Sequence, residues 1–449
     1  MFIRFAALLL ASSAVAAAPS TAQSTITERS VSAHQTFLAS DALQGRGSAT
    51  RDEAIAAAYV ASQFQSYGLV PAPGMDGYLQ QATVIRTRLD GAPSMTVGGT
   101  PIAAPTLILA SGNAVSGPLT IISSADPAKL PSAPVVLVTD PAADARALFG
   151  AAARKKVKLL LLPETEASRG LLGMVGGQAR LPTYLEGKAP EGEVTLALVP
   201  ASALALMASK PEAAVELKVP VKLEKAITTN AIGYLKGSDA KAGTILLSAH
   251  LDHLGVRADG TIMHGANDDA SGTTAVMELA KTLAAGKKPR RSIIFAAFGS
   301  EELGGFGSTF FAEHPPVPLT QIVANLSFEM IGAQDPKLPK NNLMMTGFER
   351  STLGPALKKQ GGLVARDPYP EQRFFERSDN YSLALKGVVA HTVSGWAVVP
   401  TYHKPDDTNA KLDIPFMTAA IRSLVAPMRW LANSRFVPSW TPGGKPEKR

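Results

Sequence analysis

Five short motifs between residues 250 and 403 contain side chains that can bind metal ions or move protons. They read HLDH (250–253), GANDDASG (265–272), GSEELGG (299–305), SFEMIG (327–332) and YHKPDDT (402–408). Each motif alone is a weak signal; in HLDH, for example, a His two residues before an Asp is common by chance. Together, and in this order, they predict a hydrolytic site that holds two metal ions.

The first two motifs offer a metal ligand, a residue that orients it and a bridge. His250 and Asp252 are two residues apart, so they share one side of an extended backbone. Asp252 can then accept a hydrogen bond from the far ring nitrogen of His250 and fix its tautomer. Asp268 can bridge two cations with its two carboxylate oxygens, while its neighbour Asp269 or Ser271 caps the following helix.

The other motifs supply three carboxylates and a second imidazole. Glu301 and Glu302 are adjacent, so one can bind metal while the other faces the substrate and transfers protons. Glu329 lies between Phe328 and Met330, where an unpaired charge is costly, and this favours a ligand role. His403 completes the set.

Two imidazoles, one bridging carboxylate and two further carboxylates leave each metal open to water, which is typical of a catalytic site. Nitrogen and oxygen ligands favour two Zn²⁺ ions, with Co²⁺ or Mn²⁺ as possible substitutes. The site is then filled, so the remaining histidines are expected to be non-ligands. These are His34, His253, His264, His314 and His391.

Buried strands that alternate with helices must bring these residues together. The runs TILLSAH, SIIFAAF and QIVANLSF are almost continuously apolar, and each ends at one of the motifs. Such strands predict an α/β fold with a mostly parallel, mixed central sheet flanked by helices. In open sheets of this kind, ligands bind beyond the carboxyl ends of the strands. Further helices are expected at residues 31–40 and 52–67.

The ends and the middle of the chain differ from this pattern. Residues 1–22 resemble a secretory signal peptide, which predicts export to the periplasm or the medium and no stable membrane insertion after cleavage. Residues 23–89 and 226–437 are expected to form the catalytic domain. Residues 90–225 contain short β-rich runs, one helix and many prolines, and predict an inserted β-rich domain. Residues 438–449 are predicted to be a disordered tail.

Composition excludes some classes of protein. The formal charge is +7, but Lys and Arg are scattered along the chain, which argues against nucleic-acid binding. The chain has no cysteine, so any metal must be held by His and carboxylate groups.

The five motifs resemble the co-catalytic dizinc aminopeptidases, which are relatives of glutamate carboxypeptidase, and residues 90–225 resemble the protease-associated domain found in many members. The resemblance implies that His250 and Glu329 hold one metal, Glu302 and His403 hold the other, and Asp268 bridges them. It also implies that Glu301 is the general base and that Tyr402 hydrogen-bonds the developing oxyanion. Glu329 stands where Asp is commoner in the family.

These expectations favour an exported zinc exopeptidase that acts on peptides, most simply an aminopeptidase that uses a bridging hydroxide. Two alternatives remain open. A carboxypeptidase or dipeptidase would need a cationic group for the substrate carboxylate, for which Arg373 and Arg377 are candidates. A binding protein that retained the fold without catalysis is the other. The sequence does not predict an oligomeric state.

Overall fold

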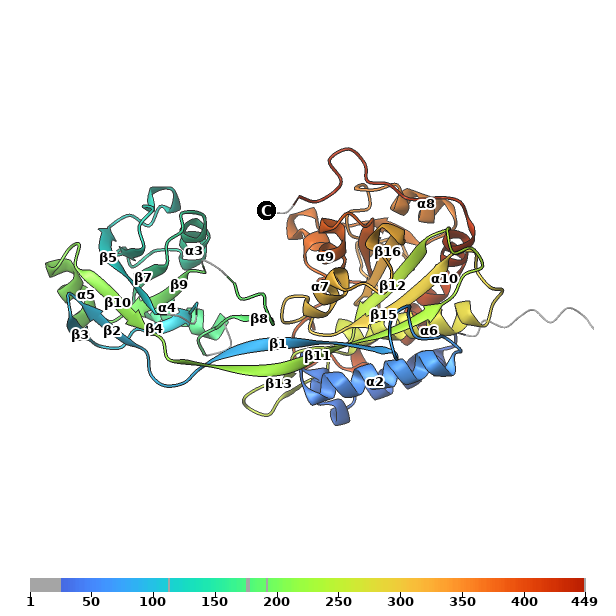
Figure 1. The fold of residues 1–449 in the computed structure, drawn as a ribbon, viewed down its shortest axis with the longest axis horizontal. Coiled ribbons are helices and arrows are strands. Elements are labelled where there is room, and N and C mark those ends of the chain that lie inside the picture. Colours follow the sequence, from blue (N-terminus) through green and yellow to red (C-terminus); the bar gives the residue numbers. More distant parts are fainter. Residues whose placement is uncertain (1–25, 112–113, 175–177, 191–192, 448–449) are drawn as a thin grey trace, which may run out of the picture.

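The chain folds into two lobes that are joined by a long antiparallel ribbon (Figure 1). The computed structural model describes residues 26–447 apart from 112–113, 175–177 and 191–192. The predicted signal peptide therefore lies outside the described residues. No helix among the described residues has the length and apolarity needed to span a membrane.

The larger lobe is built on a mixed sheet that has nine strands within the described residues, in the order β18-β17-β19-β16-β12-β15-β11-β1-β8. These strands are β1 (Leu79–Leu89), β8 (Thr183–Leu185), β11 (Val221–Leu235), β12 (Thr244–His250), β15 (Ser292–Phe298), β16 (Ile322–Glu329), β17 (Leu343–Met345), β18 (Val364–Arg366) and β19 (Ala390–Ser394). At its centre, β12 runs parallel to β15 and β16, and β16 runs parallel to β19. The carboxyl ends of these strands therefore meet at one edge.

Helices cover both faces of this sheet. The helices of the described residues are α1 (Glu28–Leu38), α2 (Arg51–Ser66), α3 (Ala145–Arg154), α4 (Glu166–Met174), α5 (Ala201–Ser209), α6 (Gly272–Ala284), α7 (Phe306–Glu313), α8 (Leu353–Lys359), α9 (Asn380–Leu385) and α10 (Ile414–Asn433). Single-turn or irregular helical segments are η1 (Asp41–Arg46), η2 (Pro127–Lys129), η3 (Ala266–Ser271), η4 (Leu319–Gln321), η5 (Pro370–Gln372), η6 (Phe374–Glu376) and η7 (Asn409–Lys411).

The alternation of side chains along each strand divides the core into two layers. On β12, Leu247 packs in the layer that includes α1, α2, α6 and α10, whereas Leu246 packs in the layer that includes α7 and α9. On β15, Phe295 and Ile294 divide in the same way. Because both faces are buried, the strands had to be apolar along their whole length. The predicted fold class is confirmed.

The smaller lobe is built on a second sheet that has eight strands within the described residues, in the order β3-β2-β10-β5-β6-β7-β9-β4. Its strands are β2 (Ser94–Val97), β3 (Thr100–Ile102), β4 (Thr106–Leu109), β5 (Val115–Ile122), β6 (Val135–Val138), β7 (Leu159–Pro163), β9 (Thr195–Val199) and β10 (Ala214–Lys218). A short pair, β13 (Gly255–Val256) and β14 (Ile262–Met263), lies apart from both sheets.

The second sheet falls inside the range predicted for the insert, although the domain limits themselves stay a prediction. Two features differ from the expectation. Helices α4 and α5 join the one helix that was expected, α3. The last β-rich run in this range, VELKVPVKLE at residues 215–224, does not form one strand, because Pro220 has no N–H to donate and separates β10 from β11. Leu223, after this break, is 61% exposed on β11.

The prediction of a disordered tail is wrong for residues 438–447, since this segment packs on the larger lobe. Trp440 contacts the rings of Phe375 and His391 and donates a hydrogen bond from Nε1 to the carbonyl of Gly387. The amide of Thr441 donates to the carbonyl of Arg350. A single large aromatic residue outweighs the polar, Pro- and Gly-rich composition that suggested disorder.

We predict that His391 makes stability depend on pH. Burial lowers the pKa of His391 to about 4, and its neutral ring contacts the carbonyl of Thr346 and the hydroxyl of Ser351. An unfolded His has a pKa of about 6.5, so only the unfolded state gains a proton between these values. The contribution of His391 to the free energy of unfolding is constant above pH 6.5. It declines by about 3 kcal/mol as the pH falls from 6.5 to 4, and it is constant again below pH 4.

The measurement is urea unfolding between pH 7.5 and 5 in the presence of a chelator, so that loss of metal does not contribute. The variant His391→Asn keeps a donor near Thr346 but cannot titrate in this range. It should lose less stability on acidification than the unmodified protein. Equal losses in the two proteins would refute the role of His391.

Candidate metal centre

Six side chains from separate parts of the larger lobe meet at the carboxyl edge of the sheet. We call them the His–carboxylate cluster, which consists of His250, His253, Asp268, Glu302, Glu329 and His403. Their nitrogen and oxygen atoms form two groups that could each hold a metal ion. All five ligands expected from the sequence are in the cluster, together with one residue that was expected to be a non-ligand.

The first group consists of His250, Asp268 and Glu329. Nε2 of His250 lies 3.3 Å from Oδ1 of Asp268 and 3.9 Å from Oε1 of Glu329. His250 is the last residue of β12, and Glu329 is the last residue of β16. The two parallel strands therefore deliver these side chains to the same place.

The second group consists of His253, Asp268, Glu302 and His403. Nε2 of His403 lies 3.1 Å from Oε2 of Glu302 and 3.2 Å from Oδ2 of Asp268. Nδ1 of His253 lies 2.9 Å from Oε1 of Glu302 and 3.7 Å from Oδ2 of Asp268. Asp268 thus turns one oxygen to each group, which is the arrangement of a bridging carboxylate.

His253, which was expected to be a non-ligand, lies inside the cluster. A strand places residues 250 and 253 on opposite faces, but β12 ends at His250 and the alternation ends with it. The amide of His253 then donates to the carbonyl of Arg46, which turns the backbone toward η1. The sequence did contain a signal, a second His directly after the HxD pattern. It was not used because five other residues already completed the expected ligand set.

The other histidines expected to be non-ligands make contacts elsewhere. His34 lies 3.3 Å from Glu278, and His264 lies 2.7 Å from Asp41. His314 packs against Phe310, and His391 lies under Trp440.

The residues of the cluster fit a cation. Six of their atoms are buried and make no well-formed hydrogen bond with any described residue, namely Nε2 of His250, both ring nitrogens of His253, Oδ2 of Asp268, Oε1 of Glu302 and Nε2 of His403. Ligand atoms about 2 Å from a tetrahedral zinc ion lie about 3.3 Å from one another. The imidazole–carboxylate separations given above, from 2.9 to 3.9 Å, are close to this value, and all ligand atoms of each group lie within 4.8 Å of one another.

The electrostatics also favour positive charge here. Burial disfavours the charged form of His403, but hydrogen bonding to Asp268 and Glu302 outweighs it and raises the pKa of His403 to about 10. Burial, together with nearby carboxylates, raises the pKa values of Glu301 and Glu329. A bound divalent cation would offset this repulsion.

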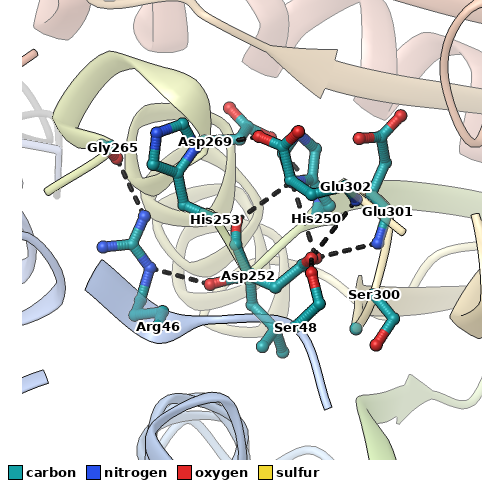
Figure 2. Close-up of polar contacts among 12 residues, drawn as sticks. Arg46, Ser48, His250, Asp252, His253, Gly265, Asp269, Ser300, Glu301 and Glu302 are labelled. Atoms are coloured by element: carbon teal, nitrogen blue, oxygen red, sulfur yellow. Dashed lines mark hydrogen bonds and ion pairs between the residues drawn. The ribbon is translucent and has the colours of Figure 1, made fainter. Parts of the chain in front are cut away.

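The carboxylate of Asp252 contacts the loop that contains Glu301 and Glu302 at shorter distances than it contacts the ring of His250. Its carboxylate accepts hydrogen bonds from the Ser48 hydroxyl at 2.5 Å and from the amides of Glu301 and Glu302 at 3.0 and 3.3 Å (Figure 2). Nδ1 of His250 lies 3.2 Å from the backbone carbonyl of Asp252 but 3.7 Å from its carboxylate. The backbone carbonyl, not the predicted carboxylate, is therefore the closer partner of the ring.

Alternate residues of GANDDASG fasten the loop that follows Glu329. Asp269 accepts a hydrogen bond from the amide of Met330, Ser271 from that of Ile331, and Asn267 from that of Gly332. Asp269 also accepts one from the first residue of α6, Gly272, at 2.8 Å, which is the capping contact expected of Asp269 or Ser271. The metal-ligand role of Asp268 stays a prediction.

Asp407 fixes the backbone of the bridging residue. Its carboxylate accepts hydrogen bonds from the amides of Asn267 and Asp268 at 2.9 and 3.1 Å. The YHKPDDT motif therefore supplies both His403 and a carboxylate that supports Asp268.

Two buried charged residues near the N-terminus support the site and were not identified from the sequence. The guanidinium of Arg46 donates hydrogen bonds to the carbonyls of Leu38, Leu251, His264 and Gly265. It thereby ties η1 to the loops that contain His253 and Asp268 (Figure 2).

Glu53 on α2 supports the loop that contains Glu301. Its carboxylate accepts hydrogen bonds from the amides of Ala49, Thr229 and Ser300 and from the Ser300 hydroxyl. Burial and the charge of Asp252 raise the pKa of Glu53 to about 7.

The cluster lies between two hollows of very different size. A cavity of about 540 Å³ opens on the side of His253 and Glu302 and extends between the lobes, lined also by Arg86 and Leu181. A hollow of about 30 Å³ lies on the side of Glu329, lined also by Arg377 and Tyr402. Ligand sites commonly have volumes of several hundred Å³, so only the first side can accommodate an extended ligand.

Comparison with known proteins agrees with this fold. Residues 230–426 match the sequence profile described as Peptidase family M28. The chain therefore contains a peptidase family M28 domain, and the expected relationship to the zinc aminopeptidases of this kind is confirmed. The relationship of the insert to protease-associated domains stays a prediction.

Curated relatives match over short regions. Aminopeptidase NAALADL1 of Mus musculus is 36% identical over 105 residues, which is 22% of this chain and 13% of that protein. Leupeptin-inactivating enzyme 1 of Streptomyces exfoliatus is 32% identical over 120 residues, or 25% of this chain and 26% of that protein. The match thus spans about a quarter or less of either relative.

Solved structures share the fold over nearly the whole chain. An aminopeptidase from Aneurinibacillus sp. strain AM-1 superposes with a TM-score of 0.58 at 18% identity, covering 92% of this chain and 96% of that one. The zinc aminopeptidase BSAP from Bacillus subtilis superposes with a TM-score of 0.55 at 16% identity, covering 92% and 97%.

We predict that Arg46 is required to hold the site together. The variant Arg46→Met keeps an unbranched apolar side chain but leaves four carbonyls without their donor. It should lower the free energy of unfolding by about 3 kcal/mol or more. The matched control is Arg51→Met, because that side chain is 86% exposed. Chemical denaturation of both variants measures the difference, and equal stabilities would show that the four hydrogen bonds contribute little.

Proposed function

We propose that this protein is an exported zinc-dependent exopeptidase, most simply an aminopeptidase that releases N-terminal residues from peptides. The observation that carries the proposal is Asp268, whose two oxygens face two groups of metal-binding side chains beside a large cavity. The peptidase family M28 domain supports the reaction class. Export rests on the sequence of residues 1–22, which lie outside the described residues.

The proposed ligands are His250 and Glu329 for one ion, Glu302 and His403 for the other, and Asp268 for both. When bound, two Zn²⁺ ions, or Co²⁺ or Mn²⁺ in their place, would supply positive charge that polarises the scissile carbonyl and acidifies water.

Glu301 is the proposed general base. It lies three residues after the end of β15 and directly before Glu302, and its amide donates a hydrogen bond to Asp252, which fixes its backbone beside the ligands. Desolvation raises the pKa of Glu301, which favours a carboxylate that can take a proton from water and return it to the leaving amine.

Tyr402 is the proposed donor to the oxyanion. Its ring stacks on His403, with 3.9 Å between the ring centroids, and it lines the small hollow beside Glu329. Burial and the neighbouring carboxylates raise its pKa, so the hydroxyl keeps its proton and can donate a hydrogen bond.

The unequal hollows support an exopeptidase. A peptide that enters through the 540 Å³ cavity has little space beyond the ligands, because the hollow on the side of Glu329 measures only about 30 Å³. The scissile bond should therefore lie near an end of the chain. Glu301 and Glu329 offer negative charge to a free α-amino group, which favours the N-terminal end.

One observation favours a carboxypeptidase or dipeptidase as the second candidate. Arg377, but not Arg373, lines the hollow beside Glu329. A guanidinium there could bind a terminal carboxylate.

We predict that Glu301→Gln binds the same amount of metal as the unmodified protein but loses at least about a hundredfold in kcat. The amide keeps the size of the side chain and cannot accept the proton. Glu28→Gln, an exposed residue of α1, is the matched control. Metal content and turnover are measured on the same samples, and a variant that retained normal kcat would remove Glu301 from the base role.

A second prediction distinguishes the two exopeptidases. An aminopeptidase should hydrolyse leucine p-nitroanilide. Its kcat/KM should be at least about tenfold lower for N-acetyl-leucine p-nitroanilide, because the acetylated substrate has no charged amine to pair with the buried carboxylates. Arg377→Met should change this activity little. A carboxypeptidase would instead hydrolyse N-acetylated dipeptides, and Arg377→Met would raise KM for them. That second pattern would reject the aminopeptidase assignment.

A further inference from the structure

The two groups of the His–carboxylate cluster do not have equal numbers of ligands. The group around His250 has three residues, whereas the group around His403 has four because it includes His253. The ligand scheme implied by the family resemblance gives each metal two terminal ligands and the bridge. His253 is outside that scheme.

The surroundings of His253 are those of a ligand rather than of a structural histidine. The residue is fully buried, and neither ring nitrogen makes a well-formed hydrogen bond with a described residue. A buried polar group left in that way costs about 1–3 kcal/mol. By contrast, His391 contacts Thr346 and Ser351, and His34 contacts Tyr59, so the other buried imidazoles of this lobe have polar partners.

The geometry directs Nδ1 of His253 at the same point as the other ligands. It lies 2.9 Å from Oε1 of Glu302, while Nε2 of His403 lies 3.1 Å from Oε2 of the same residue. The rings of His253 and His403 are nearly perpendicular, at 74°, with 5.6 Å between their centroids. Two imidazoles therefore approach one pair of carboxylates from different directions, as two corners of a tetrahedron would.

The neighbouring loop leaves space for this ring. Gly265 has a positive φ of 59°, and a Cβ atom at that position would lie 2.4 Å from Cγ of His253. The backbone of His253 is also fixed, by the hydrogen bond from its amide to the carbonyl of Arg46. The ring is thus held in position by elements on both sides.

We propose that His253 is a fourth protein ligand, so that the two metal positions have different tasks. The position formed by His253, Asp268, Glu302 and His403 is closed by protein and retains its ion tightly. The position formed by His250, Asp268 and Glu329 has only three protein ligands and keeps the open coordination place. The different tasks of the two positions rest on the proposed two-metal function, but the ligand role of His253 is tested by metal binding alone.

Zinc titration of the metal-free full chain by calorimetry tests the proposal. The unmodified protein should bind two equivalents, with affinities that differ by at least about tenfold. His253→Ser should weaken the tighter equivalent by at least about tenfold and leave the weaker one in place. His264→Asn, which changes a histidine that contacts Asp41 outside the cluster, should bind zinc as the unmodified protein does.

Cobalt substitution gives a second readout, because visible absorption of Co²⁺ is strong in four-coordinate sites and weak when water raises the coordination number. The first equivalent should give the strong spectrum in the unmodified protein and the weak one in His253→Ser. Should the Ser variant not fold, His253→Asn replaces it, since its amide is a poorer ligand at nearly the same place.

Unchanged zinc affinities and an unchanged cobalt spectrum in the His253 variant would overturn the proposal, as would an equal loss at both positions. If the unmodified protein shows the two affinities but hydrolyses no peptide, the proposed function fails while this inference stands.

Discussion

The site depends on a concentration of negative charge that the fold encloses. The side chains of Glu302 and Glu329 each approach Asp268 within a few ångströms, and Glu301 precedes Glu302 in the chain. Such charges repel one another and are costly to remove from water unless cations compensate them. The imidazoles of the cluster bring no fixed positive charge once they serve as ligands, so divalent ions are the species that balances this arrangement.

The rest of the lobe keeps these groups from moving apart. Parallel strands place His250, Glu302 and Glu329 at one edge, and α/β topology does this for any suitable side chain at a strand end. The final positions are set by backbone hydrogen bonds to Asp252, Asp269 and Asp407, three carboxylates that contact amides of the ligand loops. Residues of one motif therefore fix the backbone of another, in addition to supplying metal ligands.

Strand ends were the part of the site that could be predicted, because an apolar run that stops at a polar motif indicates a buried strand whose end places that motif at the edge of the sheet. His250, Glu302 and Glu329 come together for that reason, whereas Asp268 and His403 are supplied by loops. Residues whose roles come from tertiary contacts could not be predicted. Arg46 and Glu53 are ordinary charged residues in the sequence, and only packing buries them against the motif loops. His253 was expected to be a non-ligand because five other residues already completed the ligand count. The tail was predicted to be disordered because composition does not reveal the contacts of Trp440 with Phe375 and His391.

Diffraction from zinc-soaked crystals, recorded on both sides of the zinc absorption edge, tests the central claim most directly. Two anomalous peaks should flank Asp268, one beside His250 and Glu329 and the other beside Glu302 and His403. A single peak, or peaks distant from Asp268, would contradict the account of a carboxylate that bridges two ions.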